Sequence, residues 1–289
     1  MGKNSSIEWC HHTHNIVWGC QRVSPGCQHC YAETLAKRYG HDVWGPAKTT
    51  ARREMSAAYW QQPYKWNKAA QQAGERARVF CGSMSDVFED HPTNADARER
   101  LWPLIDATPW LDWLLLTKRP ENISRMLPAA WLETPQANVW LGTSVEDQQR
   151  ADERIPHLLR VPAAVRFLSC EPLLGPVNIR DFVTDGAGHW RTPTKERRWV
   201  IAGGESGHGA RPMNPNWARS LRQQCEAAGV SFFFKQWGEE LPKGQGDHGL
   251  DERGLYRRES FISGHAYYRV GKHAAGRLLD GVEWNELPI

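Results

Sequence analysis

Short apolar runs alternate with amphipathic stretches along most of this 289-residue chain. From residue 78 onward the apolar runs recur at similar intervals, and most are followed by a segment with helical periodicity. Continuous apolar strands that alternate with helices are typical of a parallel sheet covered on its outer face. Seven strands are predicted in this way, at residues 15–19, 78–83, 113–117, 138–143, 166–169, 199–203 and 231–235.

Helices are predicted between these strands, where capping residues frame the periodic segments. Thr93 and Asn94 are candidate N-caps of one helix, and Gly229 suits the C-terminal end of the last. Residues 40–78 are expected to form helical pieces joined by loops. The predicted helices cover residues 31–39, 93–107, 121–132, 147–159 and 216–228.

Six to eight strand–helix units usually close into a full or partial barrel, so an α/β fold with a partial (β/α)6-type barrel is predicted. An open doubly wound sheet is the competing arrangement, but no G-x-G-x-x-G follows the first predicted strand. Residues 1–238 are expected to form the barrel domain. Residues 239–289 are rich in glycine and are expected to form a C-terminal extension with short strands. Residues 181–197 are polar and basic and are expected to be an inserted loop.

The composition is that of a globular protein, 40% hydrophobic and 24% charged. A net charge of +3 permits binding to a polyanion but does not by itself indicate it. The first residues lack the apolar core of a signal peptide, and no run approaches the roughly 20 apolar residues of a membrane span. Seven cysteines, three clustered and four scattered, do not form a secreted disulfide framework. A cytoplasmic location without a membrane partner is therefore expected.

Three cysteines lie within the eleven residues from Cys20 to Cys30, which we call the cysteine loop. Pro25 and Gly26 form a turn signal between Cys20 and Cys27, and a helical stretch follows Cys30. Such a turn can bring the three sulfurs together, and three thiolates bind a soft metal or an iron–sulfur cluster well. A closed structural zinc site needs four ligands, so three leave one metal position open. The loop therefore favours an iron–sulfur cluster with one iron free to bind another molecule.

Three alternatives remain for the cysteine loop. The three thiols could be unrelated buried cysteines, or the last two could be a redox pair, although such pairs have no third thiol nearby. Zinc ribbons usually pair one C-x-x-C with a second, which is missing here. Structural zinc would instead need a fourth ligand from among Cys10, His11, His12 and His14.

Polar residues recur just past the C-terminal ends of successive predicted strands. In a parallel α/β fold these ends face one mouth, where ligands bind. Serine there can simply cap a helix, but a charged side chain after a buried strand needs a partner, such as a ligand amine, carboxylate or ribose hydroxyl. The candidates are Ser83, Ser85, Asp86, Thr117, Lys118, Arg119, Ser144, Glu146, Glu171, Glu205, Ser206, Lys235 and Gln236.

Several segments resemble, in the same order along the chain, a phage and bacterial protein family with a three-cysteine C-x6-C-x2-C motif. That family looks like an outlying branch of the radical S-adenosylmethionine (SAM) superfamily. The x6 spacing departs from the usual x3 of the superfamily, and His29 stands where an aromatic residue often packs near the adenine. The similar segments lie between residues 7 and 238 and include the cysteine loop, 83–86, 116–120, 139–146, 171–173, 203–207 and 234–238.

The resemblance implies a TIM-like partial barrel and a 4Fe–4S cluster on Cys20, Cys27 and Cys30, with SAM on the fourth iron. The reduced cluster would cleave SAM, and a 5′-deoxyadenosyl radical would abstract hydrogen from the substrate, while the protein supplies binding and orientation. The electron donor would be a flavodoxin or a ferredoxin. The resemblance assigns His29, Ser83, Ser85, Asp86, Ser144 and Glu146 to SAM binding. It leaves Lys118, Glu171, Glu205 and Lys235 as catalytic candidates on the substrate side.

Some phage enzymes of this type resemble steps in thymine hypermodification of viral DNA. This favours an isomerase or base-modifying enzyme that acts on a modified pyrimidine in DNA or on a nucleotide, in the host cytoplasm if the protein is phage-encoded. A target base would have to leave the stack. Basic and aromatic residues at 40–78 and 181–198 are compatible with DNA or a nucleotide, but a solvated face is the favoured interpretation of these charges. The alternatives are a zinc-stabilised nucleic-acid-binding or adaptor protein without catalysis, and a radical SAM enzyme with a small-molecule substrate.

Overall fold

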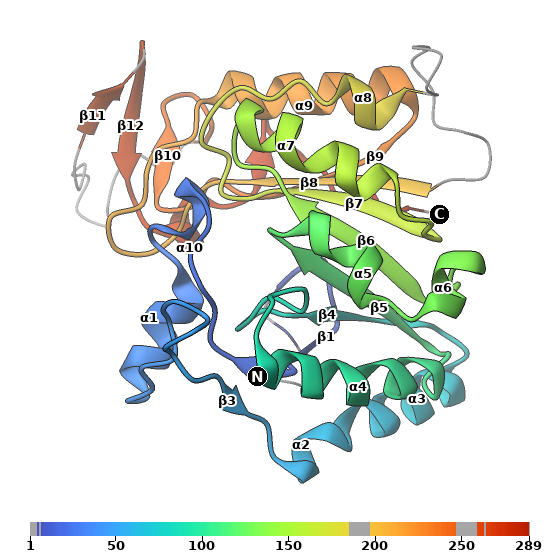
Figure 1. Cartoon of the computed structure of the whole chain (residues 1–289). Coiled ribbons are helices and arrows are strands. Elements are labelled where there is room, and N and C mark those ends of the chain that lie inside the picture. Colours follow the sequence, from blue (N-terminus) through green and yellow to red (C-terminus); the bar gives the residue numbers. More distant parts are fainter. Residues whose placement is uncertain (1–4, 6, 185–196, 247–258, 263, 289) are drawn as a thin grey trace. The chain divides into compact units, whose positions relative to one another are not determined.

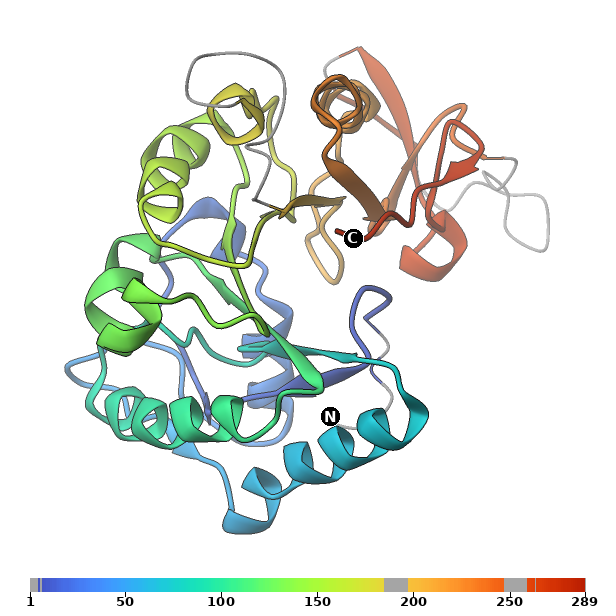
Figure 2. The same ribbon diagram turned by 90° about the vertical axis from the view of Figure 1, so that its right-hand side faces the viewer.

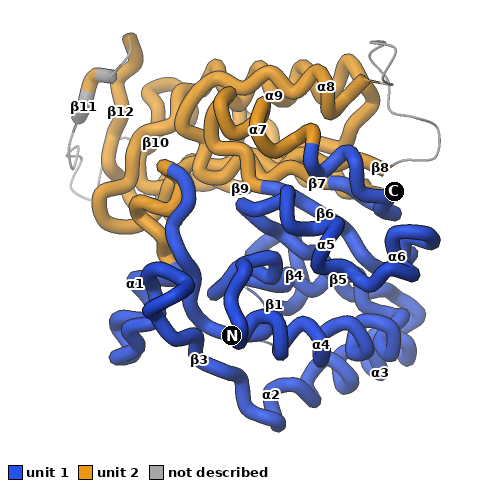
Figure 3. The backbone as a smooth tube through the Cα atoms, in the orientation of Figure 1, with its two compact units in different colours: residues 1–24, 32–143, 157–166 blue, residues 25–31, 144–156, 167–289 orange. Residues whose placement is uncertain are grey.

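The computed structural model describes residues 5, 7–184, 197–246, 259–262 and 264–288 (Figure 1). The chain divides into two compact units (Figure 3). Unit 1 comprises residues 1–24, 32–143 and 157–166, and unit 2 comprises residues 25–31, 144–156 and 167–289. The division passes through the cysteine loop, so Cys20 belongs to unit 1 whereas Cys27 and Cys30 belong to unit 2.

Seven strands form the main sheet, in the order β1-β4-β5-β6-β7-β8-β9. Their order follows the order of the chain, without the reversal that creates the switch point of a doubly wound sheet. The predicted partial-barrel fold with parallel strands is therefore confirmed, and the doubly wound alternative is excluded. The strands are β1 (His12–His14), β4 (Ala77–Cys81), β5 (Leu111–Thr117), β6 (Val139–Ser144), β7 (Val165–Cys170), β8 (Arg197–Gly203) and β9 (Ser231–Gln236).

The first strand of the sheet lies earlier in the chain than predicted. β1 pairs in parallel with β4, whereas the predicted residues 15–19 leave the sheet. Asn15 causes the departure, because its side chain donates to Ser83 Oγ at 3.0 Å and accepts from Met84 N at 2.7 Å. The following residues form β2 (Val17–Trp18), which pairs antiparallel with β3 (Arg53–Glu54) outside the main sheet.

Two of the predicted helices in the first half of the chain differ in detail. The helix predicted at 121–132 is divided at Pro128, which has an extended backbone, into α5 and α6. α4 is capped by His91 rather than by Thr93 or Asn94, since Pro92 takes the first helical position and His91 Nδ1 accepts from Thr93 N at 3.2 Å. The helices here are α1 (Tyr31–Arg38), α2 (Ala57–Trp60), α3 (Gln62–Ala73), α4 (Pro92–Asp106), α5 (Ile123–Met126) and α6 (Ala129–Glu133), with the 3-10 turns η1 (Pro25–Cys27) and η2 (Pro120–Asn122).

The helices cover the sheet locally within each unit. In unit 1, α3 packs on β4 and β5, and in unit 2, α9 (Pro215–Ala228) packs on β8 and β9 (Figures 1 and 2). α9 ends at Gly229 with a φ of 63°, as the sequence predicts, because only glycine adopts this backbone without strain. The other helices of this half are α7 (Gln148–Leu159) and α8 (Arg180–Val183). α8 begins the predicted inserted loop, of which residues 185–196 lie outside the described residues.

The C-terminal part contains short strands, as expected for residues 239–289. Its last described residues lie along the edge strand β9, where Phe234 N donates to Trp284 O at 3.0 Å and Glu286 N to Phe232 O at 3.2 Å. These bonds satisfy edge groups that would otherwise be unpaired. A domain boundary at residue 238 stays a prediction. The elements are β10 (Glu240–Pro242), β11 (Glu259–Ile262), β12 (His265–Arg269), α10 (Lys272–Ala275), β13 (Leu278–Leu279) and β14 (Val282–Glu283).

None of the helices in the described part of the chain combines the length and the apolar character that a membrane span requires.

Candidate cysteine site

The three thiols of the cysteine loop differ from the other cysteines in exposure. Cys20, Cys27 and Cys30 are partly exposed. The remaining cysteines are buried; they are Cys10, Cys81, Cys170 and Cys225. Partly exposed thiols can reach a ligand, and a set of three sulfur donors has the chemistry that soft metals prefer. The cysteine loop is thus the part of the chain where thiol chemistry is available.

The described residues contain no group of three or more His, Cys, Asp or Glu side chains placed to hold a metal ion. Because Cys20 lies in a different unit from Cys27 and Cys30, the convergence of the three sulfurs stays a prediction from their spacing.

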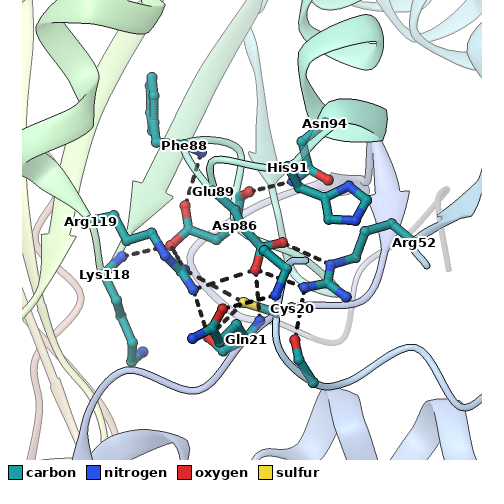
Figure 4. Close-up of polar contacts among 12 residues, drawn as sticks. Cys20, Gln21, Arg52, Asp86, Phe88, Glu89, His91, Asn94, Lys118 and Arg119 are labelled. Atoms are coloured by element: carbon teal, nitrogen blue, oxygen red, sulfur yellow. Dashed lines mark hydrogen bonds and ion pairs between the residues drawn. The ribbon is translucent and has the colours of Figure 1, made fainter. Parts of the chain in front are cut away.

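A buried arginine contacts Cys20 within unit 1. Arg119 follows β5, and its Nη1 donates to Cys20 Sγ at 3.6 Å, while its Nη2 donates to Gln21 O at 2.6 Å (Figure 4). Although Cys20 is partly exposed, desolvation by the surrounding protein raises the pKa of its thiol to about 12, and the Arg119 guanidinium lowers it. A metal that binds Cys20 must therefore displace a proton, and Arg119 favours the thiolate that remains.

Arg119 belongs to a buried network of two arginines and two carboxylates, which we call the Arg119 network and which consists of Arg52, Asp86, Glu89 and Arg119 (Figure 4). Arg52 Nε and Nη2 donate to the two carboxylate oxygens of Glu89 at 2.9 and 3.0 Å. Glu89 Oε1 also accepts from Gln21 N at 2.8 Å. The network therefore holds the residue after Cys20 by both its backbone N–H and its carbonyl.

Asp86, a predicted SAM-binding residue, uses its carboxylate inside the protein. Oδ1 accepts from Phe88 N at 3.0 Å and from Thr117 Oγ1 at 2.7 Å. Oδ2 accepts from Lys118 N at 3.0 Å and from Arg119 Nη1 at 2.9 Å. With two hydrogen bonds on each oxygen, Asp86 organises the ends of β4 and β5 around Arg119.

The two predicted serines after β4 have different surroundings. Ser83 is buried and bonded to Asn15. Ser85 forms a parallel bridge to Gly19, directly before Cys20, and its Oγ is buried without a hydrogen-bond partner among the described residues. A buried hydroxyl without a partner needs a water molecule or a ligand. Ser85 is therefore the better placed of the two for contact with a bound molecule.

In unit 2, Glu146 supports the turn of the cysteine loop. Glu146 is fully buried and pairs with Arg154, whose Nη1 lies 2.8 Å from Glu146 Oε2 and 2.9 Å from the carbonyl oxygen of Ser144. A Cβ atom on Gly26 would lie 2.4 Å from Glu146 Oε1, so only glycine allows this approach. Ser144 and Glu146, predicted ribose contacts, are thus close together, and Glu146 lies under the turn.

Arg211 supports the same turn from another direction. Its Nη2 donates to Pro25 O at 3.0 Å and its Nη1 to Gln28 Oε1 at 3.3 Å. The same guanidinium pairs with Glu205, a predicted substrate-side residue, through Nε at 2.8 Å. His29 packs against Gly209, where a Cβ would lie 2.9 Å from the imidazole Cε1. The segment 25–31 is therefore held by residues that follow β6 and β8.

Two other predicted catalytic residues form a pair. Lys235 Nζ donates to Glu171 Oε1, and both side chains are about one-sixth exposed, at 16% and 17%. The pair is partly desolvated, which strengthens its attraction and makes either residue alone costly. Lys118 belongs to unit 1, where its backbone N–H donates to Asp86, whereas Glu171 and Lys235 belong to unit 2. The structure thus brings Glu171 and Lys235 together and places Glu205 with Arg211.

Of the arginines that hold the loop, Arg119 was predicted only as a polar residue after a strand, without a role, and Arg211 was not singled out. Arg119 stands in the same strand-end segment as Lys118, so its position after β5 is a signal that sequence reasoning could have used. No comparable signal exists for Arg211, which follows no strand directly and reaches Pro25 across 186 positions in the chain.

The residues proposed as a fourth zinc ligand have other roles within unit 1. His11 Nδ1 accepts from Arg78 N at 2.8 Å, and Cys10 is buried beside Ser5. His12 stacks on Trp66 at 4.4 Å, and His14 is fully buried among aromatic rings. None of them presents a donor in the way a structural zinc site requires, which weakens the zinc alternative.

The consecutive parallel strands and the helices that cover them define the class of the protein, an α/β protein of the partial-barrel type. Over residues 4–288 the chain matches the family described as protein of unknown function (DUF5131), and it belongs to that family. No curated protein is similar to it in sequence.

Solved structures of spore photoproduct lyase variants are similar in fold. The variant with bound AdoMet and dinucleoside spore photoproduct is 14% identical, with a TM-score of 0.44, over 93% of this chain and 72% of that chain. A second variant is 12% identical, with a TM-score of 0.48, over 93% of this chain and 71% of that chain.

Proposed function

We propose that this protein is a radical SAM enzyme whose cysteine loop holds a 4Fe–4S cluster through Cys20, Cys27 and Cys30. One observation carries the proposal: these three thiols are partly exposed and the four others are buried. The cluster with SAM would supply one electron and a carbon radical able to abstract an unactivated hydrogen. The chain itself would bind, orient and shield the reactants.

The residues present suit such a group in donor chemistry. Three thiols are one fewer than a closed zinc site requires, and they leave one iron for SAM. Gly19 and Gly26 let the backbone of the loop approach its supports, since a Cβ would lie 2.4 Å from Val43 O and from Glu146 Oε1 respectively. We assign the unpartnered hydroxyl of Ser85 to SAM, with Ser83 beside it.

The remaining SAM contacts are proposed on the unit 2 side. Ser144 ends β6 and Glu146 follows it; both would face the ribose, with Arg154 paired to Glu146. His29 would pack near the adenine, because it lies in the cysteine loop against Gly209. Asp86 acts indirectly in this scheme, because its four hydrogen bonds hold Arg119 and Lys118 in place.

We propose that the substrate is a modified pyrimidine base in DNA, which the enzyme isomerises or modifies. Glu171, Lys235, Glu205 and Lys118 would bind and orient it, and a flavodoxin or ferredoxin would supply electrons. Trp60 and Trp66, in the stretch proposed to contact DNA, are buried, so base stacking there must involve other residues. Tyr64, which is 43% exposed, remains a candidate in that stretch.

The decisive experiment is anaerobic purification with iron and sulfide analysis. We expect a brown protein with broad absorbance near 400 nm that releases 5′-deoxyadenosine from SAM when reduced. Cys27→Ala should abolish release, whereas Cys225→Ala, which removes a buried thiol outside the loop, should retain it. A colourless protein with one zinc per chain would refute the proposal.

The substrate requires a separate experiment. Nucleosides from DNA of cells with and without the protein should differ by one modified pyrimidine in mass spectrometry. Binding of the purified protein to such DNA should weaken steeply with salt, as expected for phosphate contacts. Unchanged DNA, together with active SAM cleavage, would point to a small-molecule substrate.

A further inference from the structure

Four acceptors surround the Arg119 guanidinium: Cys20 Sγ, Gln21 O and the carboxylates of Asp86 and Glu89 (Figure 4). The side chain is 10% exposed, so water does not compete strongly for its N–H groups. A sulfur at 3.6 Å is therefore within reach of a fixed, charged donor.

The guanidinium cannot easily turn away from Cys20. Glu89 is held by both Nε and Nη2 of Arg52, and Arg52 also donates to the carbonyl oxygens of Thr50 at 2.9 Å and Gly45 at 3.0 Å. Asp86 is anchored on β5 through Thr117. The donor is thus fixed by contacts that do not involve the cysteine.

The charges of the Arg119 network cancel without the cysteine, since two arginines face two carboxylates. Arg119 therefore acts on the Cys20 sulfur mainly as a directional hydrogen-bond donor rather than as an uncompensated positive charge. A lysine at this position would keep the charge but lose the planar fork that reaches the sulfur, the carbonyl and the carboxylates together.

We propose that Arg119 is a positioning residue that donates a hydrogen bond to the Cys20 thiolate and raises the reduction potential of a cluster bound there. Reduction adds negative charge, and a donor at a ligand sulfur stabilises the reduced form more than the oxidised form. This inference rests on the proposed function, because it concerns the cluster that Cys20 would hold.

The test is a redox titration of the full chain after anaerobic reconstitution, followed by electron paramagnetic resonance. In Arg119→Gln we expect reduction to become about tenfold less favourable, which lowers the potential by about 59 mV for a one-electron couple. Arg119→Lys should give a smaller shift in the same direction. Arg125→Gln is the control, because Arg125 is exposed and pairs with Asp90 away from Cys20.

The outcomes separate the two proposals. A wild-type protein that binds no iron refutes the proposed function and this inference with it. Full iron loading with wild-type potentials in both Arg119 variants refutes only the role of Arg119. If Arg119→Gln does not fold, the role of Arg119 is tested by comparing wild type with Arg119→Lys by proton electron–nuclear double resonance in H2O and D2O. Loss of one exchangeable proton coupling supports the role, and an unchanged spectrum overturns it.

Discussion

Arg211 binds one carboxylate oxygen of Glu205 twice, through its own backbone N–H at 2.9 Å and through Nε at 2.8 Å. The Glu205 side chain is 4% exposed and the Arg211 side chain 30%. The carboxylate of the pair is therefore buried, whereas the guanidinium is partly exposed. Arg211 also donates a hydrogen bond to the carbonyl oxygen of Pro25. Glu205 thus orients the arginine that fixes the turn of the cysteine loop.

Replacing Arg211 by Gln should leave the Glu205 carboxylate without its cation and release the Pro25 carbonyl. We expect the free energy of unfolding to fall by about 2 kcal/mol, measured by urea denaturation. Arg125→Gln is the matched control, because Arg125 and its partner Asp90 are 52% and 73% exposed and such surface pairs contribute little. Equal losses in both variants would contradict a special role for the buried pair.

Replacing Lys235 by Met should separate SAM cleavage from substrate chemistry. Lys235 pairs with Glu171, and we propose both for the substrate side, so the loss of Lys235 should leave 5′-deoxyadenosine release intact. We expect product formation to fall at least about tenfold, because a charge-assisted contact to substrate is worth about 1.5–3 kcal/mol. Chromatography of both products from one reaction measures the ratio. Equal losses of 5′-deoxyadenosine release and of product formation would assign Lys235 to the SAM site instead.

Gly204 should be intolerant of any side chain for steric reasons. A Cβ on Gly204 would lie 1.9 Å from Trp237 O, and a Cβ on Gly238 would lie 2.0 Å from Glu205 O. Gly204→Ala should therefore cost more than about 3 kcal/mol or prevent folding. Gly229→Ala is the control, since Gly229 has a positive φ but open space, and it should cost about 1 kcal/mol. Thermal unfolding of both variants distinguishes a backbone clash from backbone strain alone.

His14 should make the protein sensitive to acid. Burial lowers its pKa from 6.5 to about 3, so the unfolded chain takes up the proton first as the pH falls. The contribution of His14 to stability is therefore fully present above about pH 6.5 and is lost progressively down to about pH 3, a loss on the order of 5 kcal/mol. His14→Phe, which keeps an aromatic ring beside Tyr59, should lose less stability between pH 7 and pH 4 in urea titrations. His273→Gln controls for the loss of an exposed imidazole, and a parallel loss in His14→Phe and wild type would contradict the prediction.

The strands that the sequence predicted correctly are continuous apolar runs, such as Leu111–Thr117, whose burial on both faces leaves a clear pattern. The first strand has no such pattern, because His12, Thr13 and His14 are polar residues. His14 is nevertheless buried by stacking on Tyr59 at 4.9 Å and by edge contacts to tryptophans, which no periodicity reveals.

The candidate site was predictable to a similar extent. Acidic residues after strands were predicted as site residues because a charge next to a buried strand needs a partner. Asp86 does have such a partner in Arg119, and Glu146 has one in Arg154. The sequence could not indicate that these partners are protein arginines, because an ion pair depends on side-chain reach in the folded chain. For the same reason the contact of Arg119 with Cys20, 99 positions apart, was not predictable.

The supports of the cysteine loop also determine when it can become ordered during synthesis. Its three thiols leave the ribosome before both arginines, since Arg119 lies 99 positions after Cys20 and Arg211 lies 186 positions after Pro25. A nascent chain that ends before residue 211 carries every thiol of the loop but lacks Arg211. A peptide of residues 20–30 lacks both Arg119 and Arg211. The cysteine loop therefore gains its full support only after residue 211 has been translated, which places any stable loading of the thiols after that point.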